Sequence, residues 1–143
     1  MRILIVENEA IIALCIGLTL QEAGHEVMGP VACLDASLRL AERMVPDLAL
    51  VDIELDRGGS GIEVARVLLK RWRVMSIYVS ARHSRGRAGT DAAVGCLNKP
   101  FATQSLIGTV EVARVLRQGD LPASLPKGLD LFHDRLRNAA GWR

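Results

Sequence analysis

The sequence has few aromatic residues, little net charge and no long apolar run. Aromatic residues make up 3% of its 143 residues and the formal net charge is +2. The few aromatic residues argue against a surface on which bases stack, and the small net charge does not indicate a nucleic acid partner. Its apolar runs are far shorter than the ~20 residues that cross a membrane. The first run ends at the acidic Glu7, too early for a signal peptide. We therefore expect a cytoplasmic protein with no nucleic acid or membrane partner.

Cysteine is also scarce. Cys15, Cys33 and Cys96 are widely separated and form no Cys-x-x-Cys or Cys/His ligand spacing, which argues against a zinc site and a disulfide framework. The composition is 50% hydrophobic and 24% charged, which is typical of an ordinary globular protein. The length suits one domain.

Five short apolar runs alternate with helical patterns. The runs are residues 3–6, 27–31, 48–51, 76–79 and 94–97. Their continuous apolarity is typical of parallel strands buried on both faces. The helical patterns are 9–23, 35–44, 61–71 and 104–117, the first with Ile11, Leu14, Cys15 and Leu18 at helical spacing. Together they predict a flavodoxin-like α/β fold, a doubly wound five-stranded parallel sheet of order 2-1-3-4-5.

Two regions depart from this regular alternation. Residues 82–90 are rich in Arg and Gly, which predicts a short or irregular helix before the fifth strand. Prolines after Gly119 interrupt the pattern, so we expect a domain over 1–118 and a C-terminal extension over 119–143. Leu129, Phe132 and Leu136 have the spacing of a short amphipathic helix. The sequence leaves three alternatives for this extension: it docks on the domain, it mediates a dimer, or it frays.

Polar residues follow four of the predicted strands: Glu7-Asn8-Glu9, Asp52, Ser80 and Asn98-Lys99. Ligands bind at the carboxyl ends of strands in such sheets, so we expect these side chains to converge. Oxygen ligands of this kind suit Mg²⁺, and Lys99 and Ser80 can bind a phosphoryl group. Asp52 is then the candidate nucleophile. No histidine follows these strands, and the absence of a dedicated general base favours a lasting phospho-aspartate.

Four segments, residues 3–9, 46–52, 79–81 and 99–101, resemble the receiver domain of two-component response regulators, of the stand-alone, single-domain type. The resemblance covers Met1 to about Gln118. It implies that Asp52 accepts phosphate from a sensor histidine kinase or histidine phosphotransfer protein, with Ser80 and Lys99 on the phosphoryl oxygens. It also implies a cis Lys99–Pro100 bond and no enzymatic activity beyond phosphorylation and dephosphorylation of Asp52. The implied Mg²⁺ ligands are Glu7, Asn8, Asp52 and the main-chain carbonyl of Glu54.

The sequence also departs from the family. Asn8 stands where an Asp is usual, which lowers the expected Mg²⁺ affinity. Cys96 stands where a Tyr or Phe usually moves inward on activation. The connection from Ser80 to Lys99 is short. Glu54 and Arg82 can form an ion pair that shields phospho-Asp52 from water, or remain two solvated surface charges.

The resemblance leaves several functions to compare. The first is a phosphoacceptor whose output is a contact with a downstream protein. That contact is predicted at the fifth strand and last helix, with Ile107, Val112 and Val115 as exposed apolar candidates or, alternatively, as core residues. A homodimer through the last helix or the tail is a further prediction. The alternative is a receiver-like interaction module that works without phosphorylation. A Mg²⁺-dependent phosphohydrolase is disfavoured, because only Glu54 could act as acid or base beside Asp52.

Overall fold

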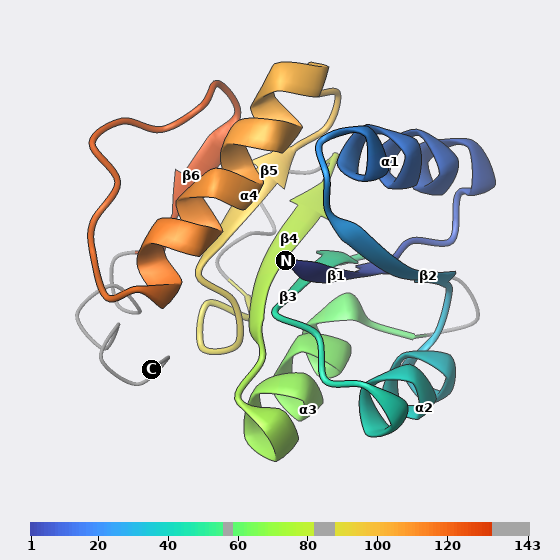
Figure 1. Cartoon of the computed structure of the whole chain (residues 1–143). Coiled ribbons are helices and arrows are strands. Elements are labelled where there is room, and N and C mark those ends of the chain that lie inside the picture. Colours follow the sequence, from blue (N-terminus) through green and yellow to red (C-terminus); the bar gives the residue numbers. More distant parts are fainter. Residues whose placement is uncertain (56–58, 82–87, 133–143) are drawn as a thin grey trace.

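The computed structural model describes residues 1–55, 59–81 and 88–132. Within them, six strands form one sheet of order β2-β1-β3-β4-β5-β6 (Figure 1). The first five strands are parallel, which confirms the predicted order. The sixth strand is antiparallel to β5 and was not predicted.

The observed elements follow the sequence patterns closely. The strands are β1 (Arg2–Val6), β2 (Glu26–Val31), β3 (Leu48–Asp52), β4 (Met75–Ser80), β5 (Gly95–Asn98) and β6 (Leu129–Leu131). The helices are α1 (Ala10–Glu22), α2 (Leu34–Arg43), α3 (Gly61–Trp72) and α4 (Thr103–Arg117). Ser60 caps α3 by accepting a hydrogen bond from the Ile62 backbone N–H at 3.2 Å. No helix in these described ranges combines the length and apolarity of a membrane span.

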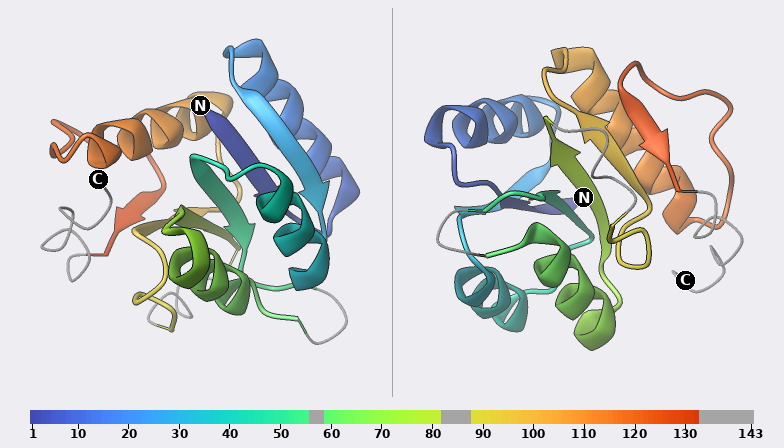
Figure 2. Two further views of the ribbon diagram at one scale, coloured as in Figure 1. Left: turned by 60° about the horizontal axis from the view of Figure 1, so that its bottom comes forward. Right: turned by 180° about the vertical axis from the view of Figure 1, so that it is seen from behind.

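The sheet is covered by helices on both faces (Figure 2). Ile3 and Ile5 belong to the apolar cluster that includes residues of α1 and α4. Their neighbours Leu4 and Val6 belong to the cluster with residues of α2 and α3. Because successive side chains of a strand point to opposite faces, both faces of β1 are buried. This explains the continuous apolar runs.

Helix α1 is apolar on both its sides. The sheet-facing side buries Ala13, Ile16, Gly17 and Leu20. The stripe of Ile11, Leu14 and Leu18 is instead 79%, 60% and 51% exposed. Sequence periodicity identified this stripe as helical, but a helix with two apolar sides does not reveal which one packs.

The connection between β4 and β5 contains no helix in its described part, residues 88–94. This part consists of turns, in which the buried Tyr78 hydroxyl donates a hydrogen bond to the Gly89 carbonyl at 2.8 Å. Of the short or irregular helix predicted over residues 82–90, only residues 88–90 are described, and these form turns. Residues 82–87 lie outside the described part of the chain.

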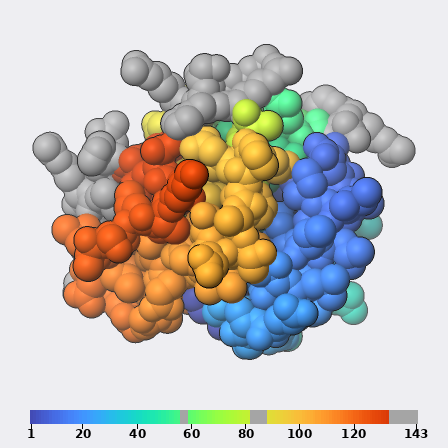
Figure 3. Space-filling view, turned by 90° about the horizontal axis from the view of Figure 1, so that it is seen from above, coloured from blue at the N-terminus to red at the C-terminus, as the bar shows by residue number. Residues whose placement is uncertain are grey.

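The segment after α4 returns to lie beside β5 (Figure 1). In the space-filling view its red surface adjoins the orange and yellow surface of the residues before it (Figure 3). Its residues 129–131 form strand β6, so the predicted amphipathic helix is wrong there; Leu136 lies outside the described residues. The outer edge of β5 explains the difference, because its unpaired backbone groups offer hydrogen bonds to a returning chain. The Asn98 side-chain amide strengthens this pairing by donating to the Gly128 carbonyl at 2.9 Å and to Asp130 Oδ2 at 3.0 Å.

Close packing brings this C-terminal segment against α4 and β5. A Cβ at Gly108 would lie 3.0 Å from the Pro126 Cβ, and one at Gly95 would lie 2.4 Å from the Asp130 carbonyl oxygen. Val112, predicted as an exposed interface residue or a core residue, is 5% exposed and belongs to the core. Val115 is half-buried and Ile107 is 39% exposed. The predicted interface is therefore partly covered by the chain itself.

Candidate functional site

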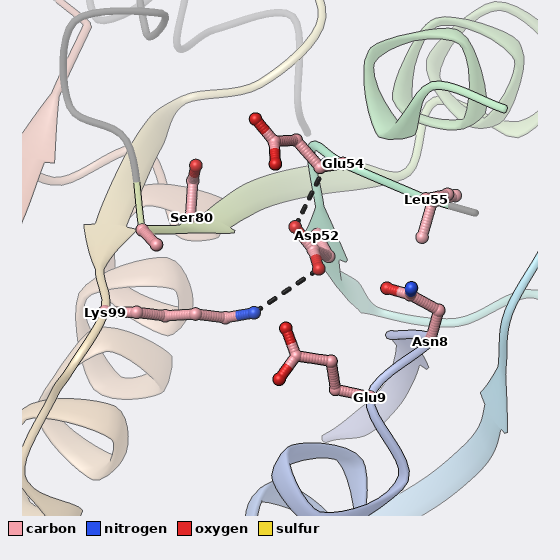
Figure 4. Close-up of a pocket in the computed structure, with 8 residues that line it drawn as sticks. Asn8, Glu9, Asp52, Glu54, Leu55, Ser80 and Lys99 are labelled. Atoms are coloured by element: carbon pink, nitrogen blue, oxygen red, sulfur yellow. Dashed lines mark hydrogen bonds and ion pairs between the residues drawn. The ribbon is translucent and has the colours of Figure 1, made fainter. Parts of the chain in front are cut away.

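The carboxyl ends of β1, β3, β4 and β5 meet at one cavity of about 340 Å³ (Figure 4). It is lined by Asn8, Glu9, Asp52, Glu54, Leu55, Ser80, Ala81 and Lys99. The structure thus brings together the residues that the sequence placed at strand ends. Glu9 also lines the cavity, although the sequence pattern, which places it after the first strand, predicts no role for it at the site.

Asp52 lies at the end of β3 with its side chain 7% exposed. Its Oδ1 accepts a hydrogen bond from the Glu54 backbone N–H at 3.0 Å, and its Oδ2 lies 3.3 Å from Lys99 Nζ. The start of α3 fits tightly behind it, since a Cβ at Gly61 would lie 1.8 Å from the Asp52 carbonyl oxygen. The lack of a side chain at Gly61 therefore allows this close approach.

Lys99 connects two carboxylates. Its Nζ donates to Glu7 Oε2 at 2.8 Å as well as contacting Asp52. The Glu7 side chain is 2% exposed and does not line the cavity. The Lys99 backbone N–H donates to the Ser80 carbonyl at 2.8 Å, and the Lys99–Pro100 peptide bond is cis, as the resemblance implied.

The ionisation of this group of charges follows from its burial. Burial, followed by the hydrogen bond and charge of Glu7, raises the pKa of Asp52 to about 6, although Lys99 acts in the opposite direction. Burial alone would lower the pKa of Lys99, but Glu7 and Asp52 raise it above its usual value. The lysine is therefore a permanent cation, and the ionised Asp52 is short of compensating positive charge.

The cavity suits a cation with oxygen ligands. Asn8 Oδ1 is buried and has no hydrogen-bond partner within the part of the chain described here. A buried acceptor of this kind is costly unless something occupies it. The described residues contain no cluster of three or more His, Cys, Asp or Glu side chains that could hold a metal, so a metal that needs many side-chain ligands does not fit here. Mg²⁺, which keeps several waters and uses few carboxylates, fits such a donor set.

The structure describes two of the three residues predicted to modulate the site, Cys96 and Glu54. Cys96 is buried on β5 between Tyr78 of β4 and Asp130 of β6. Burial, with the nearby charge of Asp130, raises the pKa of its thiol to about 11, so it stays protonated. Glu54 is exposed at the cavity. Arg82 lies outside the described residues, so its ion pair with Glu54 stays a prediction.

Both the sequence and the fold match known proteins. A family model described as the response regulator receiver domain matches residues 3–111. The N-terminal domain of a response regulator/sensory box/GGDEF 3-domain protein from Carboxydothermus hydrogenoformans superposes with a TM-score of 0.74 at 27% identity. That match covers 83% of this chain and 98% of the other.

Two curated proteins are similar in sequence. The transcriptional regulatory protein PdtaR of Mycobacterium tuberculosis is 34% identical over 116 residues, which are 78% of this chain and 56% of PdtaR. The phyllosphere-induced regulator PhyR of Methylorubrum extorquens is 30% identical over 119 residues, 82% of this chain and 45% of PhyR. The chain thus spans about half the length of these relatives.

Proposed function

The chain belongs to the response regulator receiver domain family, and we propose that it is a phosphoacceptor in a two-component phosphorelay, with Asp52 as the acceptor. One observation above all supports this: a buried aspartate lies 3.3 Å from a lysine ammonium in an open, oxygen-lined cavity. The proposed donor is a phosphohistidine on a sensor histidine kinase or histidine phosphotransfer protein. The proposed output is a contact with a downstream protein.

The proposed transfer needs few groups. A carboxylate oxygen of Asp52 attacks the phosphorus atom as the P–N bond to the donor imidazole breaks, and the imidazole nitrogen keeps the electron pair. Lys99 balances negative charge on the phosphoryl oxygens, and the Ser80 hydroxyl donates a hydrogen bond to them. No side chain lining the described part of the cavity is a histidine. In that part, only carboxylates such as that of Glu54 are available as a base for water, so we expect the acyl phosphate to persist.

Mg²⁺ is the cofactor of this proposal. Asn8, Asp52 and the main-chain carbonyl of Glu54 are the residues proposed to hold it. Glu7, the fourth ligand that the resemblance implied, lies behind them with its two carboxylate oxygens bound to the Glu9 backbone N–H and to Lys99. The ion supplies positive charge that Lys99 alone does not provide beside Asp52. Without a cation, Asp52 has a raised pKa, and its ionised form costs stability above pH 6. Added Mg²⁺ should therefore raise the melting temperature more at pH 7.5 than at pH 5.

An apolar surface adjoins the phosphoacceptor cavity. Ile11, Ile12, Cys15, Pro100 and Phe101 line a neighbouring groove, which shares Glu9, Ala81 and Lys99 with the cavity. The exposed Leu14 and Leu18 continue it along α1. An exposed apolar patch of this kind marks a binding surface. Its continuity with the cavity supports the phosphohistidine donor as its occupant, since that donor must reach Asp52.

The acceptor assignment is tested by incubating the chain with acetyl phosphate and Mg²⁺ and measuring the intact mass. We expect the addition of one phosphoryl group, and no addition in Asp52→Asn. Failure of acetyl phosphate and of every histidine kinase tried to label the chain would contradict the proposal. The chain would then be an interaction module that works without phosphorylation.

The donor surface is tested with two phosphate sources. In Ile11→Glu, transfer from a phosphorylated kinase that labels the wild-type chain should slow by about tenfold or more, because a charge on a desolvated apolar contact is costly. Labelling by acetyl phosphate should be unchanged. Leu121→Glu is the matched control, since Leu121 is 69% exposed but lies after α4. Equal slowing in both variants would argue against α1 as the docking surface.

A further inference from the structure

Glu9 is the pocket residue to which the sequence assigned no role. It precedes α1 as the N-cap residue, yet its side chain makes no capping hydrogen bond. The carboxylate instead points toward the cavity that contains Asp52 and Lys99 (Figure 4). An N-cap residue normally uses its side chain to satisfy a backbone N–H of the first turn. Capping therefore does not explain this position of the Glu9 side chain.

Glu7 and Glu9 divide two tasks between them. Both carboxylate oxygens of Glu7 are engaged: Oε1 accepts from the Glu9 backbone N–H at 3.1 Å and Oε2 from Lys99 Nζ at 2.8 Å. Glu7 is buried and does not line the cavity, whereas Glu9 is exposed and does. Glu7 is thus the counter-ion of the lysine. Of the two glutamates, Glu9 is the one that can face a solvated cation.

The charge at the cavity needs a further carboxylate. Asn8 offers an unpartnered amide oxygen but no negative charge, and the charge of Asp52 is already shared with Lys99. We propose that Glu9 compensates for the neutral Asn8, holding a hydrated Mg²⁺ through the water molecules of the ion while Asn8 binds with its amide oxygen. Contact through water suits Mg²⁺, which keeps several of its water molecules when it binds to proteins. This inference rests on the function proposed above.

The test is the Mg²⁺ affinity of the full chain, measured by calorimetric titration at low salt without any phosphodonor. Glu9→Gln should weaken binding by about three- to tenfold, as expected for one charge acting on a divalent ion across a water molecule. Glu22→Gln, at the other end of α1, changes the net charge equally and should leave the affinity unchanged. Adding Asn8→Asp to Glu9→Gln should restore binding, because it places the charge on the neighbouring residue.

Three results would overturn the inference: no measurable Mg²⁺ binding by the wild-type chain, equal affinity in Glu9→Gln and wild type, or an equal loss in Glu22→Gln. Circular dichroism of each variant shows whether α1 is intact. The outcome is separable from the proposed function. If acetyl phosphate fails to label Asp52 while Mg²⁺ binding depends on Glu9, the phosphoacceptor proposal fails and the metal site remains. If acetyl phosphate labels Asp52 but the Mg²⁺ affinity does not depend on Glu9, the inference about Glu9 fails and the phosphoacceptor proposal remains.

Discussion

Two edges of the sheet are stabilised in different ways. The inner edge is the side on which the carboxyl ends of β1, β3 and β5 lie, and the outer edge is the lateral edge formed by β5 and β6. At the inner edge, buried charges from three strands meet, with Lys99 between Glu7 and Asp52. At the outer edge, backbone hydrogen bonds and glycines join β6 to β5. Buried charges need fixed partners, whereas an edge strand can accept another segment. The inner edge is thus a fixed arrangement of charges, and the outer edge is where the C-terminal segment adds a strand.

The largest loss is expected at the inner edge from Gly61→Ala. The added Cβ would lie 1.8 Å from the Asp52 carbonyl oxygen, and neither backbone can move without shifting α3 or β3. We expect a loss of at least about 3 kcal/mol of unfolding free energy, measured by urea denaturation, together with slower labelling by acetyl phosphate. Gly17→Ala is the comparison, because its added Cβ would meet only ordinary contacts, the nearest at 3.9 Å from Ile5 and Val27 side-chain atoms. A loss in Gly61→Ala no larger than in this control would show that the close approach is unimportant.

Lys99→Met should come next, with a loss of about 3 kcal/mol at pH 8, because it leaves two buried carboxylates without their cation. The loss should shrink as pH falls toward 5, since the carboxylates then take up protons and lose their repulsion. Urea denaturation across this pH range measures it. A loss independent of pH would indicate that Lys99 acts through packing alone.

At the outer edge, Gly95→Ala should cost only about 1–2 kcal/mol. The added Cβ would meet the Asp130 carbonyl oxygen at 2.4 Å, but β6 can move away while β1 to β5 remain paired. Hydrogen exchange should therefore accelerate at Phe132, whose N–H donates to the Val94 carbonyl, and stay slow in β3. Labelling of Asp52 should persist. Loss of labelling would show that the two edges are coupled.

The smallest effect is expected for Asp47, which precedes β3. Its carboxylate accepts from the Arg2 backbone N–H at 2.7 Å and lies 3.1 Å from Arg117. Although burial opposes the shift, these two contacts lower the pKa of Asp47. A lowered pKa stabilises the fold above the unfolded value and this contribution is lost as pH falls below about 4. Asp47→Asn should cost about 1 kcal/mol or less at pH 7 and nothing at low pH. A difference independent of pH would contradict this explanation.

The sheet and most of the candidate site could be predicted from sequence because each depends on local patterns. Continuous apolar runs marked β1, β3 and β4, and polar residues at their ends marked Asp52 and Ser80. Topology then brings these ends together. The packed side of α1 could not be predicted, because Ile11 and Leu14 are as apolar as the buried residues of the helix. Strand β6 was missed because its pairing depends on an open edge far away in the sequence.

The sequence by itself determined the order of strands and helices, and which residues follow each strand, because burial on both faces selects continuous apolar segments. Only the tertiary structure decided how the charges are shared: Glu7 turns inward to Lys99, while Glu9, two residues later, faces the cavity. Both are glutamates beside the same strand. Their difference arises from the contacts available on either side of the chain, which only folding creates.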